Sequence, residues 1–158
     1  MALSEENGFR EWLAWGRFNH GWALAEQGQL EQGVAEMEAG VAGFRRLSGV
    51  PWQQYTIALL AQGYARMGRK EEALEMLNEA LAHIERSGER VDQAEMLRLK
   101  GELLLMRDGG ATEEAEHSFR AGIEVARAQE AKWWELRTTS SLARLLAKDG
   151  RRDEAHKM

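Results

Sequence analysis

The sequence contains no cysteine and only one proline. The missing cysteine excludes disulfides and thiolate chemistry, and a single proline leaves nearly every segment free to form a helix. No apolar run reaches the roughly 18 residues of a membrane-spanning helix, so we expect no membrane partner. The formal net charge is −5, which argues against nucleic acid as a partner. The first residues carry no secretory signal pattern, so the predicted location is cytoplasmic.

Small residues recur along the chain at a nearly fixed spacing. The glycines Gly28 and Gly68, each expected to end a helix, lie 40 positions apart. Two further sets of small residues keep about the same spacing: Gly21, Ala61, Gly101 and Ala143, and then Gly33, Ala73, Ala115 and Ala155. A period of this length is typical of a solenoid, in which each unit buries its apolar face against its neighbours.

Glycine breaks divide the chain into expected helices that pair as antiparallel hairpins. The expected helices span residues 4–27, 30–47, 51–67, 70–86, 91–107, 112–130 and 131–149, with a short last helix in 151–158. A coiled coil is excluded because each heptad run would end at the next glycine. We therefore predict an all-α fold with one domain over residues 1–158. Its repeats would be 4–48, 51–88, 91–130 and an incomplete 131–158.

The spacing within each hairpin resembles the tetratricopeptide repeat. The second hairpin carries the resemblance best, through Ala61, Tyr64, Gly68, Ala73, Leu77 and Ala80. The resemblance implies an α-solenoid that forms a right-handed superhelix. These repeats are about 40 to 42 residues long, whereas the family's unit has about 34, so each helix gains about one turn.

Three segments also resemble the C-terminal repeats of large bacterial signalling proteins that contain a class III nucleotide cyclase or a predicted ATPase. The segments are 21–28, 98–105 and 132–137 with 141–145. The resemblance implies a sensor or interaction region. The cyclase and ATPase motifs are absent, so neither activity is expected in this chain.

Motifs for catalysis or metal binding are also missing from the sequence. It has no phosphate-binding GxxxxGK[ST] loop and no HExxH pair. The four histidines are scattered along the chain. We therefore expect no enzyme activity, no cofactor and no metal site.

The aromatic and arginine residues are the candidates for partner binding. All six tryptophans fall in, or at the start of, the first helix of a hairpin, the helices that would line the concave face of a solenoid. Tryptophan, tyrosine and arginine often dominate binding energy, so we expect that face to bind a peptide or helix of a partner protein. The candidate residues are Trp15, Phe18, Trp22, Tyr55, Gln62, Arg98, Glu102, Arg137 and Arg144.

Two alternatives compete with this interpretation. The rings could pack between hairpins, which the pattern favours for Trp12, Trp52 and Trp133. The arginines could instead form a solvated ion-pair face with nearby glutamates, namely Glu95, Glu102 and Glu135.

The last hairpin suggests a homodimer. The apolar side chains of this hairpin need a partner helix to cover them, and the C-terminal tail is too short to do so. They are Leu142, Leu145 and Leu146. An exposed apolar strip marks an interaction surface, which a second copy or a missing segment of a larger protein could cover. Besides the protein-binding module, two other functions therefore stay open: a sensor for a small effector and a structural homo-oligomer.

Overall fold

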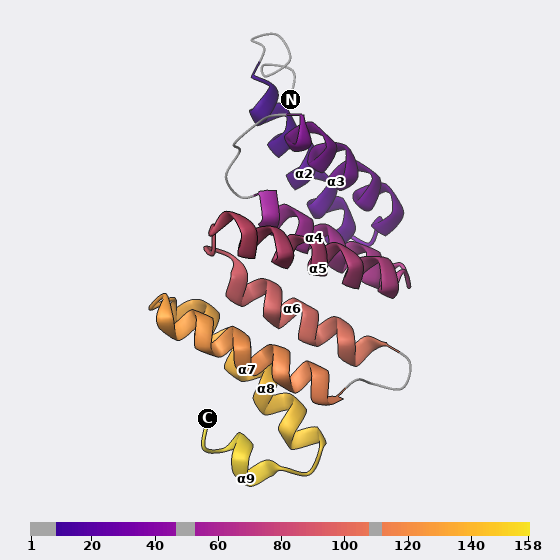
Figure 1. The fold of residues 1–158 in the computed structure, drawn as a ribbon. Coiled ribbons are helices and arrows are strands. Elements are labelled where there is room, and N and C mark those ends of the chain that lie inside the picture. The colour runs from indigo at the N-terminus through magenta and orange to yellow at the C-terminus, as the bar shows by residue number, and fades with distance from the viewer. Residues whose placement is uncertain (1–8, 47–52, 108–111) are drawn as a thin grey trace. The chain divides into compact units, whose positions relative to one another are not determined.

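The computed structural model describes residues 9–46, 53–107 and 112–158, and every regular element in those ranges is a helix. This confirms the predicted all-α fold (Figure 1). The helices are α2 (Arg10–Glu26), α3 (Leu30–Arg45), α4 (Gln53–Arg66), α5 (Lys70–Ser87), α6 (Gln93–Met106), α7 (Thr112–Ala128), α8 (Lys132–Lys148) and α9 (Arg152–Ala155). Among the described residues, none of these helices is both long and apolar enough to cross a membrane.

The chain divides into two compact units, Met1–Met76 and Leu77–Met158, and the boundary in the sequence falls within α5. The first unit contains α2, α3, α4 and the start of α5, and α3 packs against both α2 and α4. The second unit contains the end of α5 together with α6 to α9, in which α7 packs between α6 and α8. Each unit therefore repeats the helix–turn–helix arrangement that the sequence predicts.

Two glycines allow α2 and α3 to cross closely. A Cβ atom at Gly21 would lie 2.5 Å from the carbonyl oxygen of Gly33 and 2.6 Å from the amide nitrogen of Met37. A Cβ atom at Gly33 would meet the Gly21 carbonyl oxygen at 2.6 Å. These contacts confirm that small residues at the repeat positions bring the two backbones together.

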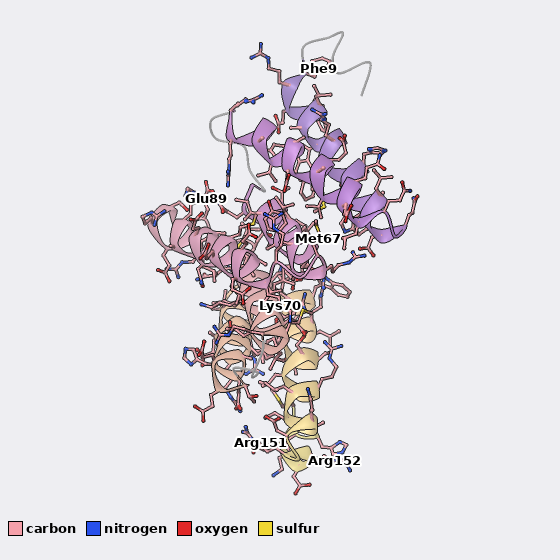
Figure 2. All side chains as sticks on the ribbon, turned by 90° about the vertical axis from the view of Figure 1, so that its right-hand side faces the viewer. Phe9, Met67, Lys70, Glu89, Arg151 and Arg152 are labelled. Atoms are coloured by element: carbon pink, nitrogen blue, oxygen red, sulfur yellow. The ribbon has the colours of Figure 1, made fainter. Side chains whose placement is uncertain are left out.

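The turns at Gly28 and Gly68 have the same geometry. The φ angles are +90° and +83°, in the left-handed region that glycine adopts at low cost. The next residue closes each helix end, since Gln29 N–H donates to the Leu24 carbonyl and Arg69 N–H donates to the Tyr64 carbonyl, at 3.0 and 2.9 Å. Figure 2 labels Met67 and Lys70, on either side of the second turn. The predicted repeat of about 40 residues is thus visible in the backbone.

Hydrogen bonds in the first unit connect residues one repeat apart. The guanidinium group of Arg66, at the end of α4, donates to Glu26 Oε1 at 2.6 Å and to the Ala25 carbonyl at 2.9 Å. Glu26 and Ala25 lie at the end of α2. The corresponding ends of the first helices of successive hairpins are therefore held together.

The first described helix begins later than expected. The sequence predicts a start at Ser4, which lies outside the described residues. Phe9 has φ −78° and ψ 70°, which is not helical, and α2 begins at Arg10. No side-chain hydrogen bond caps this end of α2.

The expectation that Leu142, Leu145 and Leu146 form an exposed strip is wrong. Their exposed fractions are 0, 4 and 0 %. They share one face of α8, which packs against α6, α7 and α9. The earlier hairpin covers most of this face, so the short tail need not cover it alone.

Candidate functional site

Helices α6 and α8 of the second unit are joined by polar side chains on equivalent repeat positions. Arg137 Nη2 lies 3.2 Å from Glu95 Oε1, and Arg144 Nη2 lies 3.3 Å from Glu102 Oε1. The Ser141 hydroxyl donates to Glu102 Oε1 at 2.6 Å. The structure thus brings together four of the predicted partner-binding residues. We call the surface formed by Glu95, Arg98, Glu102, Arg137, Ser141, Arg144 and Lys148 the α6–α8 face.

Arg98 is the buried member of this face. Its Nε and Nη2 atoms each donate to a carboxylate oxygen of Glu95 at 2.8 Å, and its Nη1 atom lies 3.4 Å from Glu102 Oε1. The Arg98 and Glu95 side chains are only 9 % and 3 % exposed. Arg98 therefore does not present its guanidinium group to a partner as the sequence analysis expected, and it holds Glu95 in place instead.

Arg137 combines an ion pair with aromatic contacts. Its guanidinium carbon lies 5.9 Å from the ring centroid of Trp133 and 5.7 Å from that of Trp134. Cation–π attraction and the bond to Glu95 together fix its position. The arginine side chain stays 38 % exposed, so part of its charge remains available at the surface.

Arg144 and Lys148 are the exposed cations of the face. The Arg144 side chain is 72 % exposed, and no described residue forms a hydrogen bond or ion pair with the Lys148 ammonium group. Both residues line a pocket of about 220 Å³. Its other lining residues are Glu102, Leu105, Thr112, Ser141, Leu145 and Asp149.

The α6–α8 face carries charges of both signs. Its cations are Arg98, Arg137, Arg144 and Lys148, and its carboxylates are Glu95 and Glu102, with Asp149 beside them at the pocket. Buried Asp92 lies just before α6. Burial, and to a lesser extent the nearby Glu95 charge, raises the pKa of Asp92. Around the pocket, Arg144 and Lys148 face Glu102 and Asp149, so the charges there balance.

The alternative of a solvated ion-pair face fits only part of this geometry. The Arg98–Glu95 pair is buried, and Glu135 binds Arg127 and Lys132 at 2.7 and 2.9 Å instead. Hydrogen bonds from Arg127 and then Lys132 hold the pKa of Glu135 below its usual range. Glu135 thus belongs to a separate cluster outside the α6–α8 face.

In the first unit, the expected aromatic residues have different environments. Phe18 is 1 % exposed, and Trp15 packs edge-on against Phe18 and Phe44 at centroid distances of 6.5 and 5.1 Å. Phe18 therefore offers no surface to a partner, because its position faces α3. Trp22 is 47 % exposed, whereas Tyr55 and Gln62 of α4 are half-buried.

Several exposed apolar residues were not selected by the sequence analysis. Trp12 and Trp133 are 66 % and 63 % exposed, so the packing that the pattern favours for them is not found. Trp52 lies outside the described residues. Leu136 on α8 is 61 % exposed. Its spacing of three residues from Trp133 is a helical neighbour signal that could have identified this pair.

Nothing in the described ranges resembles a metal centre, since no group of three or more histidine, aspartate or glutamate side chains there could hold an ion. The charged groups of the α6–α8 face pair with one another instead.

Comparisons with known proteins give a match to one repeat family over part of the chain. Residues 14–39, 58–86 and 136–156 match the family model of the tetratricopeptide repeat. A crystal structure from Podospora anserina, of nearly identical TPR-like repeats of a candidate kinesin light chain, has a TM-score of 0.70 and 20% sequence identity. That match covers 89% of this chain and 68% of the other. No curated protein matches the sequence.

Proposed function

We propose that this chain, which carries tetratricopeptide repeats, binds a peptide of a partner protein through the α6–α8 face. Tetratricopeptide repeats are in general protein–protein interaction modules. One observation carries the assignment of the face. The α6–α8 face holds two exposed cations, Arg144 and Lys148, beside an open pocket, and the buried Arg98–Glu95 ion pair lies next to them on the same face.

The buried pair gives the face a fixed geometry. Glu95 accepts two hydrogen bonds from Arg98 and forms an ion pair with Arg137, so the arginine of α8 is paired with a buried carboxylate. Pre-positioned side chains lose less entropy when a partner binds. A face that is prepared in this way suits recognition better than a set of independent surface charges.

Trp22 is a second candidate contact, in the first unit. It is the most exposed of the aromatic residues that we predicted there. Since Phe18 is buried and Trp15 packs on Phe44, Trp22 exposes the most surface of the three, with 47% of the residue accessible. Tyr55 and Gln62 of α4 also stay predicted contacts.

A sensor for a small effector is the second candidate function. That function favours a closed apolar pocket. The pocket beside Arg144 combines four charged residues with Leu105 and Leu145 and is not a closed apolar cavity, which favours a peptide instead. A role in bacterial signalling and a cytoplasmic location stay predictions.

A homo-oligomer formed through the last hairpin also stays a prediction. It no longer has the strip of Leu142, Leu145 and Leu146 to support it, because these side chains are buried. A homodimer would need a different surface of the second unit.

Affinity capture from a lysate of the source organism tests the function. The bait is the full chain, compared with a Trp133→Ala, Arg144→Ala double variant and with an Arg86→Ala, Arg120→Ala control whose changes lie on α5 and α7. We expect a protein that the wild type and the control capture and the first variant loses. Equal capture by all three would contradict the assignment of the face.

A further inference from the structure

We propose that one side of α8 docks a single amphipathic helix of a partner protein, at a surface separate from the α6–α8 face. The surface consists of Leu136, Ser140, Ala143 and Ala147, which we call the α8 stripe. The partner helix would carry a small residue, a large apolar residue four positions later and a second small residue three positions after that. This inference goes beyond the proposed function, because it names a second site and the residue pattern that the site accepts.

The turn geometry fixes which residues of α2 and α8 are equivalent. Gly28 and Gly150 both have a left-handed φ, +90° and +81°. The N–H of the next residue donates to the Leu24 carbonyl in the first turn and to the Leu146 carbonyl in the second. Positions of α2 and α8 therefore correspond at an offset of 122 residues. The equivalents of the α8 stripe on α2 are Ala14, Phe18, Gly21 and Ala25.

On α2 this side of the helix is covered by the second helix of the hairpin, and all four equivalent residues are buried. A Cβ atom at Gly40 of α3 would lie 2.8 Å from Phe18 Cβ and 2.9 Å from the Ala14 carbonyl oxygen. A Cβ atom at Gly33 would lie 2.8 Å from Ala25 Cβ. Helix α3 therefore lies directly on these residues.

The equivalent side of α6 is covered in the same way. Ala94 and Gly101 occupy two of these positions, and both are buried. A Cβ atom at Gly122 of α7 would lie 3.1 Å from the Ala94 carbonyl oxygen, and one at Gly101 would lie 2.5 Å from the Phe119 ring. Two hairpins thus show what covers this side of a first helix, namely a second helix that crosses it at very short distance.

On α8 the same side is open. Leu136 is 61 % exposed, Ser140 and Ala147 are also exposed, and Ala143 is half-buried. The helix that packs on α8 at this end of the chain, α9, has four residues, whereas α3 has 16. About three turns of α8 therefore lack the cover that α2 and α6 have.

The covering helices share one pattern of residue sizes. A small residue is followed by a large apolar residue and then by a second small residue, at spacings of four and three, and all of these residues are buried. The sets are Gly33, Met37 and Gly40 in α3, Ala73, Leu77 and Ala80 in α5, and Ala115, Phe119 and Gly122 in α7. Small residues permit the close crossing and the large residue fills the adjacent gap. A helix with this pattern is therefore the occupant that fits the α8 stripe.

A second copy of this chain is a poorer occupant than a partner protein. In a folded copy, the pattern residues of α3, α5 and α7 are already buried within their own unit. The copy would have to open one of its own hairpins to offer such a helix, whereas a partner protein can present one directly.

The α8 stripe borders the α6–α8 face but recognises a different chemistry. Ser140 lies at the border, since it is three residues from Arg137 and four from Arg144. None of the four stripe residues is charged. Docking therefore depends on apolar contact and close fit, and it should change little when salt screens the charges of the neighbouring face.

A library of helical peptides displayed on yeast and selected on the full chain tests the inference. Each peptide has the sequence of α5 (Lys70–Ser87), with the positions of Ala73, Leu77 and Ala80 randomised. We expect selection of glycine, alanine or serine at the outer two positions and of a large apolar residue at the middle position. Selection of other residue types at these positions, or no binding peptide at all, would overturn the proposal.

The affinity of a selected peptide is then compared between variants of the chain. Leu136→Gln, Ala143→Gln should weaken binding by about tenfold or more, because the longer polar side chains hold the two helices apart. A matched control, Val91→Gln, Ala35→Gln, also changes one exposed apolar residue and one alanine, and it should keep the affinity. Arg144→Ala should keep it too, which separates this site from the α6–α8 face. Equal affinity of all four chains would overturn the proposal.

Light scattering of the chain alone tests the alternative occupant. We expect the same mass for the wild type and for the Leu136→Gln, Ala143→Gln variant. A dimer that becomes a monomer on this change would assign the α8 stripe to a second copy, and the partner helix would be wrong. Circular dichroism confirms that each variant is folded. The library is selected on the wild-type chain, so its result remains decisive if a variant fails to fold.

Discussion

Arg144 Nη2 lies 3.3 Å from Glu102 Oε1, although the two residues are 42 positions apart in the sequence. One full repeat separates them, so the bond joins equivalent positions of α6 and α8. Ser141 and Glu102 form a similar bond at a separation of 39. The repeat therefore does more than build the fold, because it places charged residues of successive hairpins on one face.

The buried and the exposed arginine of this face should differ in their effect on stability. Arg98→Ala would leave Glu95 buried with only Arg137 as a counter-ion, and we expect a loss of about 3 kcal/mol or more. Arg144→Ala should cost less than about 1 kcal/mol because its ion pair is exposed. Urea denaturation followed by circular dichroism measures both. Similar losses would show that the Arg98–Glu95 pair does not support the face.

Gly21→Ala should destabilise the first unit. At an open helical position the change from glycine to alanine stabilises by about 1 kcal/mol. Here the new Cβ atom would lie 2.5 Å from the Gly33 carbonyl oxygen, so the two helices must separate. We expect a loss of about 1 to 3 kcal/mol, measured by thermal unfolding.

Ala35→Gly is the matched control, since Ala35 is an exposed residue of α3. It should lose only about 1 kcal/mol of helix propensity. An increase in stability for Gly21→Ala would mean that α2 and α3 do not cross as closely as described.

Asp92→Asn should stabilise the chain at neutral pH. Burial and Glu95 raise the pKa of Asp92, so the folded state disfavours its charged form. The stability of the wild type should therefore rise as the pH falls through the raised pKa toward the unfolded value, where Asp92 is neutral in both states. The Asp92 side chain makes no capping hydrogen bond, so asparagine loses none.

The test is the difference in unfolding free energy between the variant and the wild type across a pH series. It should be largest near neutral pH and shrink in acid. A difference that stayed constant with pH would contradict the burial of a charged Asp92.

Glu116 should show the opposite behaviour. Hydrogen bonds from Arg151 and then from Arg120 hold the pKa of Glu116 below its usual range. This contribution to stability is present above the unfolded pKa and is lost as the pH falls through the folded pKa. Arg151 lies at the C-terminal end of the second unit (Figure 2), and its Nη1 atom binds Glu116 Oε2 at 2.5 Å. Arg151→Ala should raise the pKa of Glu116, as measured by the carboxyl carbon shift in an NMR titration.

The burial of the last-hairpin leucines also gives a prediction. Leu146→Ala should destabilise the second unit by about 2 to 5 kcal/mol, because its side chain is fully buried. The mass of the folded chain in light scattering should be the same for the variant and the wild type. A dimer that becomes a folded monomer on this change would restore these leucines as an interface.

The sequence predicts the features that depend on backbone geometry. Gly28 and Gly68 could be assigned because a left-handed residue at a helix end favours glycine. The close contact of Gly21 and Gly33 follows from the spacing of small residues. The repeat also accounts for the two ion pairs that join α6 to α8, Glu95 with Arg137 and Glu102 with Arg144.

Burial within one helix face could not be predicted as well. Arg98 and Arg144 lie on helices of the same kind, yet one is buried and the other is exposed. Periodicity assigns residues to a face, but the neighbouring helix decides which edge of that face is covered. The predicted exposure of Phe18 and Leu142 was wrong for the same reason. Helix α3 buries Phe18, and α6 and α7 bury Leu142.

Site-specific photocrosslinking tests the central claim, that the α6–α8 face binds the partner. A benzoylphenylalanine is placed at Ser140, an exposed position of α8, or at Glu124, an exposed position of α7. Each labelled chain is irradiated with the partner protein identified by affinity capture. We predict a covalent adduct from the Ser140 position and little from the Glu124 position. Equal yields, or an adduct from the Glu124 position alone, would contradict the account.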